Sequence, residues 1–477
     1  MNRTAVGDNL RALALALIVL FLLTSVGVGR RMLLSPELAN DPQDPRVAAV
    51  AFDRSRGPVL ARDGTVLAQG HPRQYAEPSL AQVVGYASAA YGAAGIELAY
   101  GAALVGQDST DPLAVLRARY LGERTPPGSV TLGIDPATQR AAAAALAGRT
   151  GAVVALDPRT GQILASVSLP APDTSALADP ARAAAAWAAA MASGAGSRPL
   201  LDRAAQGLYA PGSVFKIVTA AAALEAGVLD PAAKVRVDDP FQADPSWGAY
   251  AVRSSSAAHG DFDLSLAMAR SENIYFAKAA LATGGARLAE AAARLGIGRT
   301  PALDLPASRG QLSRLGTLDR PTLVADTGFG QGELLVSPLQ MALVAAAVAN
   351  GGVQPDPHHA IAVRDGGGNA LPAPDGGPGR RVMSADVARI LTRALVDAVE
   401  APGAFAAGAR VAGLRVAGKT GTAENPSGAA HGWFVGFAPA DAPTVAVAVI
   451  LEHAPRGGED AAPVGAAVLR AAAARAR

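Results

Sequence analysis

The pattern of apolar and polar positions divides the chain into one long apolar segment and a larger region of short alternating elements. Residues 12–29 carry no charge and are almost all apolar, which is long enough to cross a bilayer as a helix. Arginine flanks this segment on both sides, at Arg3, Arg11, Arg30 and Arg31. We therefore expect residues 1–31 to form a short cytoplasmic tail and a single transmembrane anchor.

The alternative for this segment is a cleaved signal peptide. The apolar stretch is longer than the usual apolar region of a signal peptide, and no clear Ala-x-Ala cleavage site precedes Arg30. We follow the interpretation of an uncleaved anchor, with the N-terminus inside because the terminal amine adds positive charge on that side. On this interpretation the protein is a single-pass membrane protein whose remaining chain is extracytoplasmic.

Residues 32–134 predict a small α+β module. Within it, Pro58–Ala61 and Thr65–Ala68 flank Arg62-Asp63-Gly64, and this arrangement is typical of a β-hairpin. The run Thr125-Pro126-Pro127-Gly128 interrupts any regular element and separates the module from the region that follows.

Residues 135–477 begin and end with strand patterns and carry helical patterns between them. The expected strands are Gly151–Leu156, Gln162–Ser168, Val411–Thr422, His431–Ala438 and Thr444–Glu452. The expected helices include Asp135–Leu146, Thr174–Gly194, Val214–Ala226, Leu264–Thr283, Pro338–Ala349 and Ala462–Ala474. Because the strands come from both ends of the region, we expect one sheet with helices packed on it, in an α+β fold.

The composition excludes several classes of function. Of the 477 residues half are hydrophobic and 17% are charged, as in folded rather than disordered proteins. A net charge of +2 and 4% aromatic residues provide neither a basic nor a stacking surface for nucleic acid. The chain has no cysteine, which excludes disulfides and thiol catalysis. The six histidines show no metal-binding spacing, so we expect neither a metal nor a cofactor.

Lysine is rare in this chain. It occurs at Lys216, Lys234, Lys278 and Lys419, and arginine supplies the rest of the positive charge. Arginine cannot release its proton near neutral pH, whereas a buried lysine can. Each lysine is therefore a candidate for acid–base chemistry.

The first candidate site is Ser213-Val-Phe-Lys216. A spacing of three residues places both side chains on one helix face, one turn apart. Ser213 falls at the start of the expected helix, where free backbone N–H groups favour a developing alkoxide. A serine hydroxyl needs a base within hydrogen-bond reach, which a neutral Lys216 supplies. The structural alternative is a capping serine followed by a surface lysine, and this pattern alone arises easily by chance.

Two further patterns follow along the chain. Lys419-Thr420-Gly421-Thr422 ends an expected strand, where its side chains can hold the carboxylate of an extended peptide and Gly421 allows close approach. Ser271-Glu272-Asn273 lies in an expected helix, where a hydroxyl can relay a proton and an amide can pair with a peptide group. Taken alone, each pattern also has a structural explanation. The first can be a turn after a strand, and most triplets of the second kind face the solvent.

Together and in this order, the three patterns resemble the catalytic motifs of penicillin-binding proteins. Other stretches resemble class B members of that family: Arg56-Gly57, Arg62-Asp63-Gly64, Gly95-Ile96-Glu97, Gly151–Pro158, Tyr209–Lys216, Gly328–Gly332, Ser337-Pro338 and Trp433–Pro439. The resemblance covers nearly all of the chain after the anchor and is greatest to the penicillin-binding protein A branch. It implies a non-catalytic module over 32–134 and a transpeptidase domain over 135–477, with an antiparallel sheet of about five strands flanked by helices.

The resemblance also implies catalytic roles. Ser213 would attack the carbonyl of a D-Ala-D-Ala stem peptide and become acylated, and β-lactams would acylate the same serine. Lys216 would take the proton of Ser213, and Ser271 would pass it towards the leaving amine, in contact with both lysines. Asn273 would hold the amide of the substrate.

The same resemblance assigns substrate binding to the Lys419 strand. Lys419 and Thr422 would contact the terminal carboxylate, with Thr420 and Gly421 beside it. The backbone N–H groups of Ser213 and Thr422 would form the oxyanion hole.

We therefore expect a peptidoglycan D,D-transpeptidase that crosslinks stem peptides and is inhibited by β-lactams. A D,D-carboxypeptidase differs only in using water to deacylate the enzyme and stays open as an alternative. A β-lactamase is disfavoured by the anchor, the extra module and the lack of a Glu-x-x-Leu-Asn pattern, and a non-catalytic scaffold is disfavoured because no motif is lost. Too few residues precede Asp135 for a glycosyltransferase domain, so the resemblance suggests a membrane-embedded glycan polymerase of the SEDS kind as partner.

Overall fold

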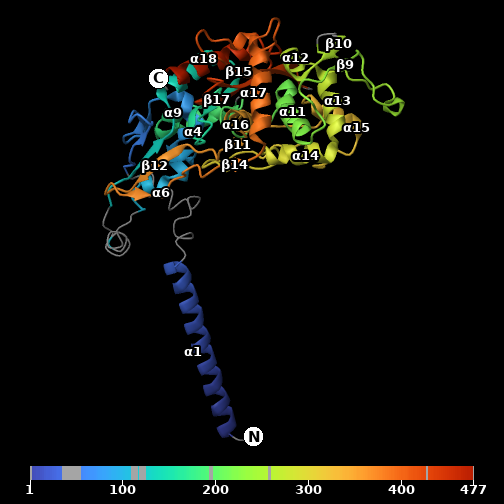
Figure 1. The fold of residues 1–477 in the computed structure, drawn as a ribbon. Coiled ribbons are helices and arrows are strands. Elements are labelled where there is room, and N and C mark those ends of the chain that lie inside the picture. The colour runs from blue at the N-terminus through green and yellow to red at the C-terminus, as the bar shows by residue number, and fades with distance from the viewer. Residues whose placement is uncertain are drawn as a thin grey trace.

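The computed structural model describes residues 3–34, 55–108, 117, 125–192, 197–255, 259–425 and 428–475. Helix α1 (Arg3–Leu34) extends away from the globular part of the chain (Figure 1). In the described part of the chain, no helix is both long and apolar enough to cross a membrane. The anchor expected at residues 12–29 therefore stays a prediction.

A five-stranded antiparallel sheet forms the centre of the globular part. Its strands follow the order β15 (Ala417–Asn425), β16 (Gly428–Ala438), β17 (Val445–Leu451), β7 (Gly151–Leu156) and β8 (Ile163–Leu169). Every neighbouring pair is antiparallel. The sheet joins strands from both ends of the region, which confirms the expectation from the sequence.

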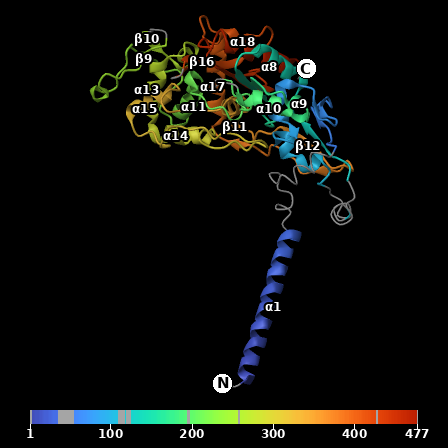
Figure 2. The same ribbon diagram turned by 180° about the vertical axis from the view of Figure 1, so that it is seen from behind.

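Helices cover both faces of this sheet, and the alternation of side chains along β17 shows how. Ala446, Ala448 and Ile450 pack into the core that also contains α16 (Pro338–Ala349) and α17 (Ala385–Glu400). The intervening residues of β17 pack into a second core with α8 (Pro136–Leu146) and α18 (Ala461–Arg475), which lie together in Figure 2. Because both faces are buried, the strand is a continuous apolar run.

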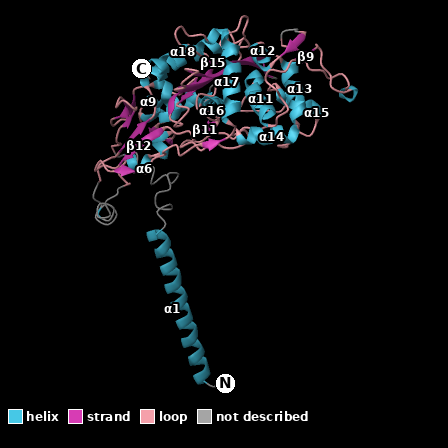
Figure 3. Cartoon of the chain, in the orientation of Figure 1, coloured by secondary structure: helices cyan, strands magenta, loops and turns pink. Residues whose placement is uncertain are grey.

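Smaller elements complete the domain around the central helices (Figure 3). They are α9 (Thr174–Ala178), α10 (Ala183–Ala192), η2 (Gly212–Phe215), α11 (Lys216–Glu225), β9 (Val235–Val237), η3 (Pro245–Trp247), β10 (Gly260–Phe262), α12 (Leu264–Ala269), α13 (Asn273–Thr283), α14 (Gly285–Arg294), α15 (Pro321–Gly328), β11 (Val353–Gln354), β14 (Arg380–Arg381) and η4 (Ala407–Ala409). Helix α13 runs beside α15 and α11, and this packing carries the residues of the candidate site.

A second, six-stranded sheet lies in the N-terminal module. Its order is β13 (Ala370–Leu371), β12 (Ala360–Arg364), β6 (Ser129–Leu132), β1 (Val59–Leu60), β2 (Val66–Gln69) and β3 (Gln74–Tyr75). The β1–β2 pair is the expected hairpin. Strands β12 and β13 come from beyond residue 135, so this sheet combines residues from both sides of the proposed boundary, which itself stays a prediction.

The rest of this module consists of short elements. They are η1 (Pro78–Leu80), α4 (Ala81–Val84), β4 (Ala87–Ser88), β5 (Gly92–Ala93), α5 (Ile96–Ala99) and α6 (Gly101–Leu104).

Two helices expected from the sequence are each broken in two. The helix expected over Thr174–Gly194 divides into α9 and α10 at Asp179-Pro180, because a residue before proline is pushed out of the helical conformation. The helix expected over Leu264–Thr283 divides into α12 and α13 at Ser271, whose φ of 55° lies in the left-handed region. Glu272 then caps the new helix by accepting a hydrogen bond from a backbone N–H.

The strand expected over Val411–Thr422 is displaced along the chain. Val411 and Leu414 instead close a turn, and β15 starts at Ala417 and continues to Asn425. The Lys419-Thr-Gly motif therefore lies within the strand rather than at its end.

A buried ion cluster fastens the N-terminal module. Glu97 is 0% exposed, and its two carboxylate oxygens accept hydrogen bonds from Arg56 Nε and Arg73 Nε, each at 2.6 Å. Arg73 also donates to the backbone oxygen of Arg56 at 3.1 Å. One carboxylate thus joins α5 to the segments that precede β1 and β3.

We predict that Glu97→Gln lowers the free energy of unfolding of this module by about 3–5 kcal/mol, because two buried guanidinium groups lose their only shared counter-charge. Thermal unfolding of the purified protein measures the change. Asp386→Asn is the control, since it removes an exposed ion pair with Arg389 and should leave the midpoint almost unchanged. Equal midpoints for both variants would contradict a structural role for the buried cluster.

Candidate active site

The eight residues expected to carry chemistry lie together at one edge of the central sheet. Strand β15 is an edge strand, and it contacts η2, which carries Ser213. The junction between α12 and α13 brings Ser271 and Asn273 to the same place, within hydrogen-bond reach of Lys216. Ser271 and Lys419, which are 148 positions apart in the sequence, are therefore in contact at this edge.

Ser213 lies in a tight 3-10 turn that leads directly into α11. Its side chain is partly exposed, whereas Lys216, the first residue of α11, is completely buried. Gly212 has a φ of 53°, and a Cβ there would stand 2.4 Å from the backbone oxygen of Thr422. Only glycine therefore allows the turn to approach β15 this closely.

The amine of Lys216 has four oxygens at hydrogen-bond distance, three of them within 2.9 Å and the fourth, Ser271 Oγ, at 3.3 Å. Its Nζ lies 2.6 Å from the Ser271 carbonyl oxygen, 2.7 Å from Asn273 Oδ1 and 2.9 Å from Ser213 Oγ. Asn273 Nδ2 donates to the Arg253 carbonyl at 3.1 Å, which fixes the orientation of that amide.

This geometry suits a neutral amine. A neutral lysine has two N–H donors and one lone pair, and the carbonyl oxygens of Ser271 and Asn273 can only accept. Both donors are then used, and the lone pair is left for the hydroxyl hydrogen of Ser213. The contacts thus aim the basic electron pair at the candidate nucleophile.

The electrostatic environment also favours the neutral form. Burial lowers the pKa of Lys216 well below its usual value, and the nearby charge of Lys419 lowers it further, while Glu272 opposes the shift. Burial lowers the pKa of Lys419 as well, to about 7. Burial and the charge of Lys419 thus both favour the neutral form of Lys216, which is the form that a general base needs.

Ser271 connects the two lysines. Its Oγ accepts a hydrogen bond from Lys419 Nζ at 2.8 Å and lies 3.3 Å from Lys216 Nζ. Its left-handed backbone turns the carbonyl towards Lys216 as well, so one residue contacts that amine with two oxygens. Ser213, Lys216, Ser271 and Lys419 form a continuous hydrogen-bonded chain.

The segment that holds Ser271-Glu272-Asn273 in place was not predicted from the sequence. The Arg253 carbonyl accepts from Asn273, Ser254 Oγ donates to Glu272 Oε2 at 2.7 Å, and Ser255 Oγ donates to the Ser271 carbonyl at 2.6 Å. Arg253, Ser254 and Ser255 are therefore each hydrogen-bonded to one residue of the triplet, in antiparallel order. The polar run Arg-Ser-Ser was the only available signal, and it is common in loops.

The residues of the motif on β15 differ in burial and in what they contact. Lys419 and Thr420 are buried, and Lys419 Nζ also donates to the Thr420 carbonyl at 3.0 Å. A Cβ on Gly421 would stand 2.8 Å from the Pro211 carbonyl oxygen. Glycine at this position therefore allows the Ser213 turn to approach β15. Thr422 is exposed beside the site, and its hydroxyl donates to the Pro455 carbonyl at 2.9 Å.

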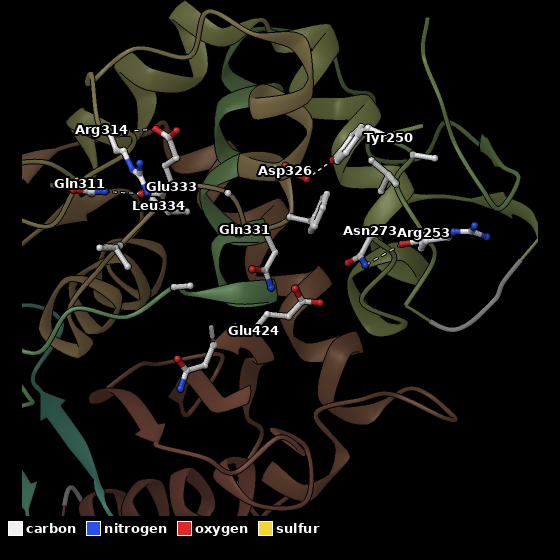
Figure 4. Close-up of a pocket in the computed structure, with 17 residues that line it drawn as sticks. Tyr250, Arg253, Asn273, Gln311, Arg314, Asp326, Gln331, Glu333, Leu334 and Glu424 are labelled. Carbon is white, nitrogen blue, oxygen red and sulfur yellow. Dashed lines mark hydrogen bonds between the residues drawn. The ribbon is translucent and has the colours of Figure 1, made fainter. Parts of the chain in front are cut away.

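A cavity of about 770 Å³ opens next to Asn273 (Figure 4). Its wall includes Tyr250, Asp326, Gln331 and Glu424, from three separate parts of the chain. Its volume is within the range of sites that hold small molecules and peptides. Among the described residues, no group of three or more His, Asp or Glu is placed to hold a metal ion.

Two family models match the chain. The model of the penicillin binding protein transpeptidase domain matches residues 151–470, and that of the penicillin binding protein A dimerisation domain matches residues 56–130. The peptidoglycan D,D-transpeptidase PbpA of Mycolicibacterium smegmatis is 32% identical over 97% of this chain and 98% of its own length. The protein of the same name from Mycobacterium tuberculosis H37Rv is 33% identical over 96% of each chain.

Solved structures agree with these matches. The ceftriaxone acyl-enzyme complex of penicillin-binding protein A from M. tuberculosis has a TM-score of 0.78 and 30% identity, over 89% of this chain and 99% of the other. Pseudomonas aeruginosa PBP2 has a TM-score of 0.75 and 30% identity, over 88% and 95%. With its serine–lysine chain, its edge-strand motif and these matches, the chain belongs to the penicillin-binding protein transpeptidase family.

Proposed function

We propose that this protein is a peptidoglycan D,D-transpeptidase that works through an acyl-enzyme on Ser213. The observation that carries the proposal is the hydrogen-bonded chain from Ser213 through Lys216 and Ser271 to Lys419. The names of the relatives from M. smegmatis and M. tuberculosis, and the acyl-enzyme state of the solved relative, support the same chemistry.

Acylation begins when Ser213 Oγ attacks the carbonyl carbon of the D-Ala-D-Ala bond. The hydroxyl proton passes to Lys216 Nζ, which already lies 2.9 Å away. As the tetrahedral intermediate collapses, the C–N bond breaks and the departing amine of the terminal D-Ala takes a proton from Lys216 by way of Ser271 Oγ. The other stem peptide residues remain attached to Ser213 as an ester.

The groups around Ser213 bind the substrate during this step. We assign stabilisation of the oxyanion to the backbone N–H groups of Ser213 and Thr422, because η2 and β15 meet at these residues. The cationic form of Lys419 suits the terminal carboxylate, and the exposed hydroxyl of Thr422 can donate to it after turning from the Pro455 carbonyl. Asn273 Nδ2 uses one hydrogen for Arg253, which leaves the second for a carbonyl of the peptide.

Deacylation separates a transpeptidase from a D,D-carboxypeptidase. In the first, the amine of a second stem peptide attacks the ester and restores Ser213, with its surplus proton returning through Lys216. In the second, water does the same. The cavity beside Asn273 offers room for a second peptide, which favours the transpeptidase.

The protein acts at the outer face of the cell membrane, with α1 as a single-pass anchor and the N-terminus in the cytoplasm. Residues 12–28 of α1 are helical, uncharged and exposed, and nearly all of them are apolar. As the partner we propose a membrane glycan polymerase of the SEDS kind, which the resemblance to class B penicillin-binding proteins suggests.

We predict that a fluorescent penicillin labels the wild-type protein and fails to label Ser213→Ala, because the acyl bond forms on that hydroxyl. Lys216→Arg should slow labelling by at least ~100-fold, since arginine keeps the charge and cannot accept the proton. Gel fluorescence against time measures both. A wild-type protein that stays unlabelled, or a Lys216→Arg variant that acylates normally, would refute the assignment.

The second reaction step has its own measurement. The purified protein is given a D-Ala-D-Ala stem peptide with and without an amine acceptor, and mass spectrometry separates crosslinked from hydrolysed product. We expect crosslinked product to dominate with the acceptor present. Hydrolysis alone, at every acceptor concentration, would establish the carboxypeptidase instead.

We predict that Lys419→Met moves the acid limb of the acylation profile to higher pH. Acylation needs neutral Lys216 and is lost as the pH falls through the Lys216 pKa. Removing the repulsion from Lys419 raises that pKa, so protonation sets in earlier on the way down. Penicillin acylation rates between about pH 5 and 10 give the profile. The exposed Lys234→Met is the control, and an unshifted limb in Lys419→Met would rule out the coupling.

We predict that the full chain sediments with membranes and is released by detergent but not by high salt, because the apolar residues 12–28 of α1 hold it in the bilayer. A chain that starts after residue 34 should appear in the soluble exported fraction when given a cleavable signal peptide. Recovery of the full chain in the soluble fraction would exclude the anchor.

A further inference from the structure

Two carboxylates face the cavity beside Asn273 from different elements. Asp326 stands on α15 and Glu424 on β15, two residues beyond Thr422. Figure 4 shows Glu424, Gln331 and Asn273 directed towards the same open space, with Asp326 and Tyr250 above it. The acidic groups therefore line the same cleft as a residue that contacts the catalytic lysine.

Neither carboxylate has a cationic partner among the residues that the structure describes. Asp326 accepts a hydrogen bond from the Tyr250 hydroxyl, which is neutral, and no ion pair includes Glu424. Arg253 also lines the cavity, but its guanidinium points away from Asp326 in Figure 4.

Glu333, the third acidic residue in the wall, is compensated. Its carboxylate lies 3.2 Å from Arg320 Nη2 and accepts from the backbone N–H of Arg314 at 2.9 Å. The wall therefore keeps two negative charges that the described chain does not balance, next to one that it does.

The negative charge of Glu424 acts on Asp326. The pKa of Asp326 is raised above its usual value, first by burial and then by the negative charge of Glu424, against the hydrogen bond from Tyr250. Asp326 is half-buried and Glu424 is exposed, so the unfavourable burial and repulsion fall on Asp326, where a cation placed between the two groups would relieve both. The arrangement is therefore suited to a positively charged ligand group.

We propose that Asp326 and Glu424 form a docking subsite for the primary ammonium group of the acceptor peptide. The inference rests on the function proposed above, in which an amine, not water, attacks the ester on Ser213. An acceptor amine is cationic in water near neutral pH, whereas water carries no charge, so this subsite raises the local concentration of the amine alone. No bond forms or breaks in this docking step.

The polarity of the cleft argues that the acceptor, not the donor, occupies this part. The donor ends in a carboxylate, which Lys419 attracts and the two acidic side chains repel. The acceptor brings a cation, which the acidic wall attracts and Lys419 repels. The positive charge of Lys419 and the negative charge of the cavity wall therefore favour different peptides at these two positions.

The test uses the full chain in detergent with four variants. Asp326→Asn keeps an acceptor for the Tyr250 hydroxyl, Glu424→Gln keeps the length of its side chain, and the double variant removes both charges. Glu333→Gln is the control within the wall, and Asp319→Asn is an exposed control outside it. Titration with fluorescent penicillin counts the competent active sites in each preparation, so a misfolded fraction does not enter the result.

The measured quantity is the ratio of crosslinked to hydrolysed product at a fixed, subsaturating concentration of an amine acceptor. We expect this ratio to fall about 3-fold in each single variant and about 10-fold in the double variant, through a higher half-saturating acceptor concentration. Both controls should retain the wild-type ratio. In the wild type alone, added salt should raise the half-saturating concentration, because the attraction is screened.

The outcomes separate the two proposals. If the wild type is not labelled by penicillin, the proposed acyl-enzyme is wrong. If labelling is intact but the double variant keeps the wild-type ratio, or Glu333→Gln lowers it equally, the docking subsite is wrong while the acyl-enzyme stands.

Discussion

The site depends on one constraint, which is that a completely buried lysine amine is held among four oxygens. Lys216 is completely buried, and its contacts to Ser271, Asn273 and Ser213 use every donor and acceptor of the neutral amine. An ammonium group in this place would have to give up its hydration beside Lys419, so burial and repulsion both drive the proton off. The activation of Ser213 thus follows from packing, and most of the surrounding structure serves to maintain that packing.

The central sheet supplies the second cation at the right position. Because β15 pairs at the edge of a sheet built from both ends of the domain, Lys419 reaches Ser271 across 148 residues of intervening sequence. The close contact depends on glycine at two points. At Gly212 and at Gly421, the Ser213 turn and β15 lie too close together for a Cβ to fit between them. The apolar interior of β17 and its covering helices therefore fixes a polar geometry that lies at the border of the sheet.

Much of this could be predicted from the sequence, because strongly periodic elements and short motifs carry local information. The strand at Gly151–Leu156 and the helix at Pro338–Ala349 have the expected bounds. The break at Ser271 could not be predicted, because its left-handed backbone is stabilised by distant partners, the amine of Lys216 and the hydroxyl of Ser255. The role of residues 253–255 could not be predicted for the same reason. The hydrogen-bond partner of a serine in a loop is distant in the sequence and is defined only by the folded structure.

The distribution of charge across the cleft links the catalytic chain to the choice of acceptor. Lys419 and Lys216 make the Ser213 side electropositive whenever either is protonated, while Asp326 and Glu424 keep the adjoining cavity negative. A cation that enters near the acidic wall stays away from Lys216 and so does not interfere with the neutral base. Once the ammonium has given a proton to solvent water, the acidic wall no longer retains the neutral amine by charge, and it is free to approach the ester. The same separation of charge therefore gathers the acceptor, protects the base and releases the nucleophile.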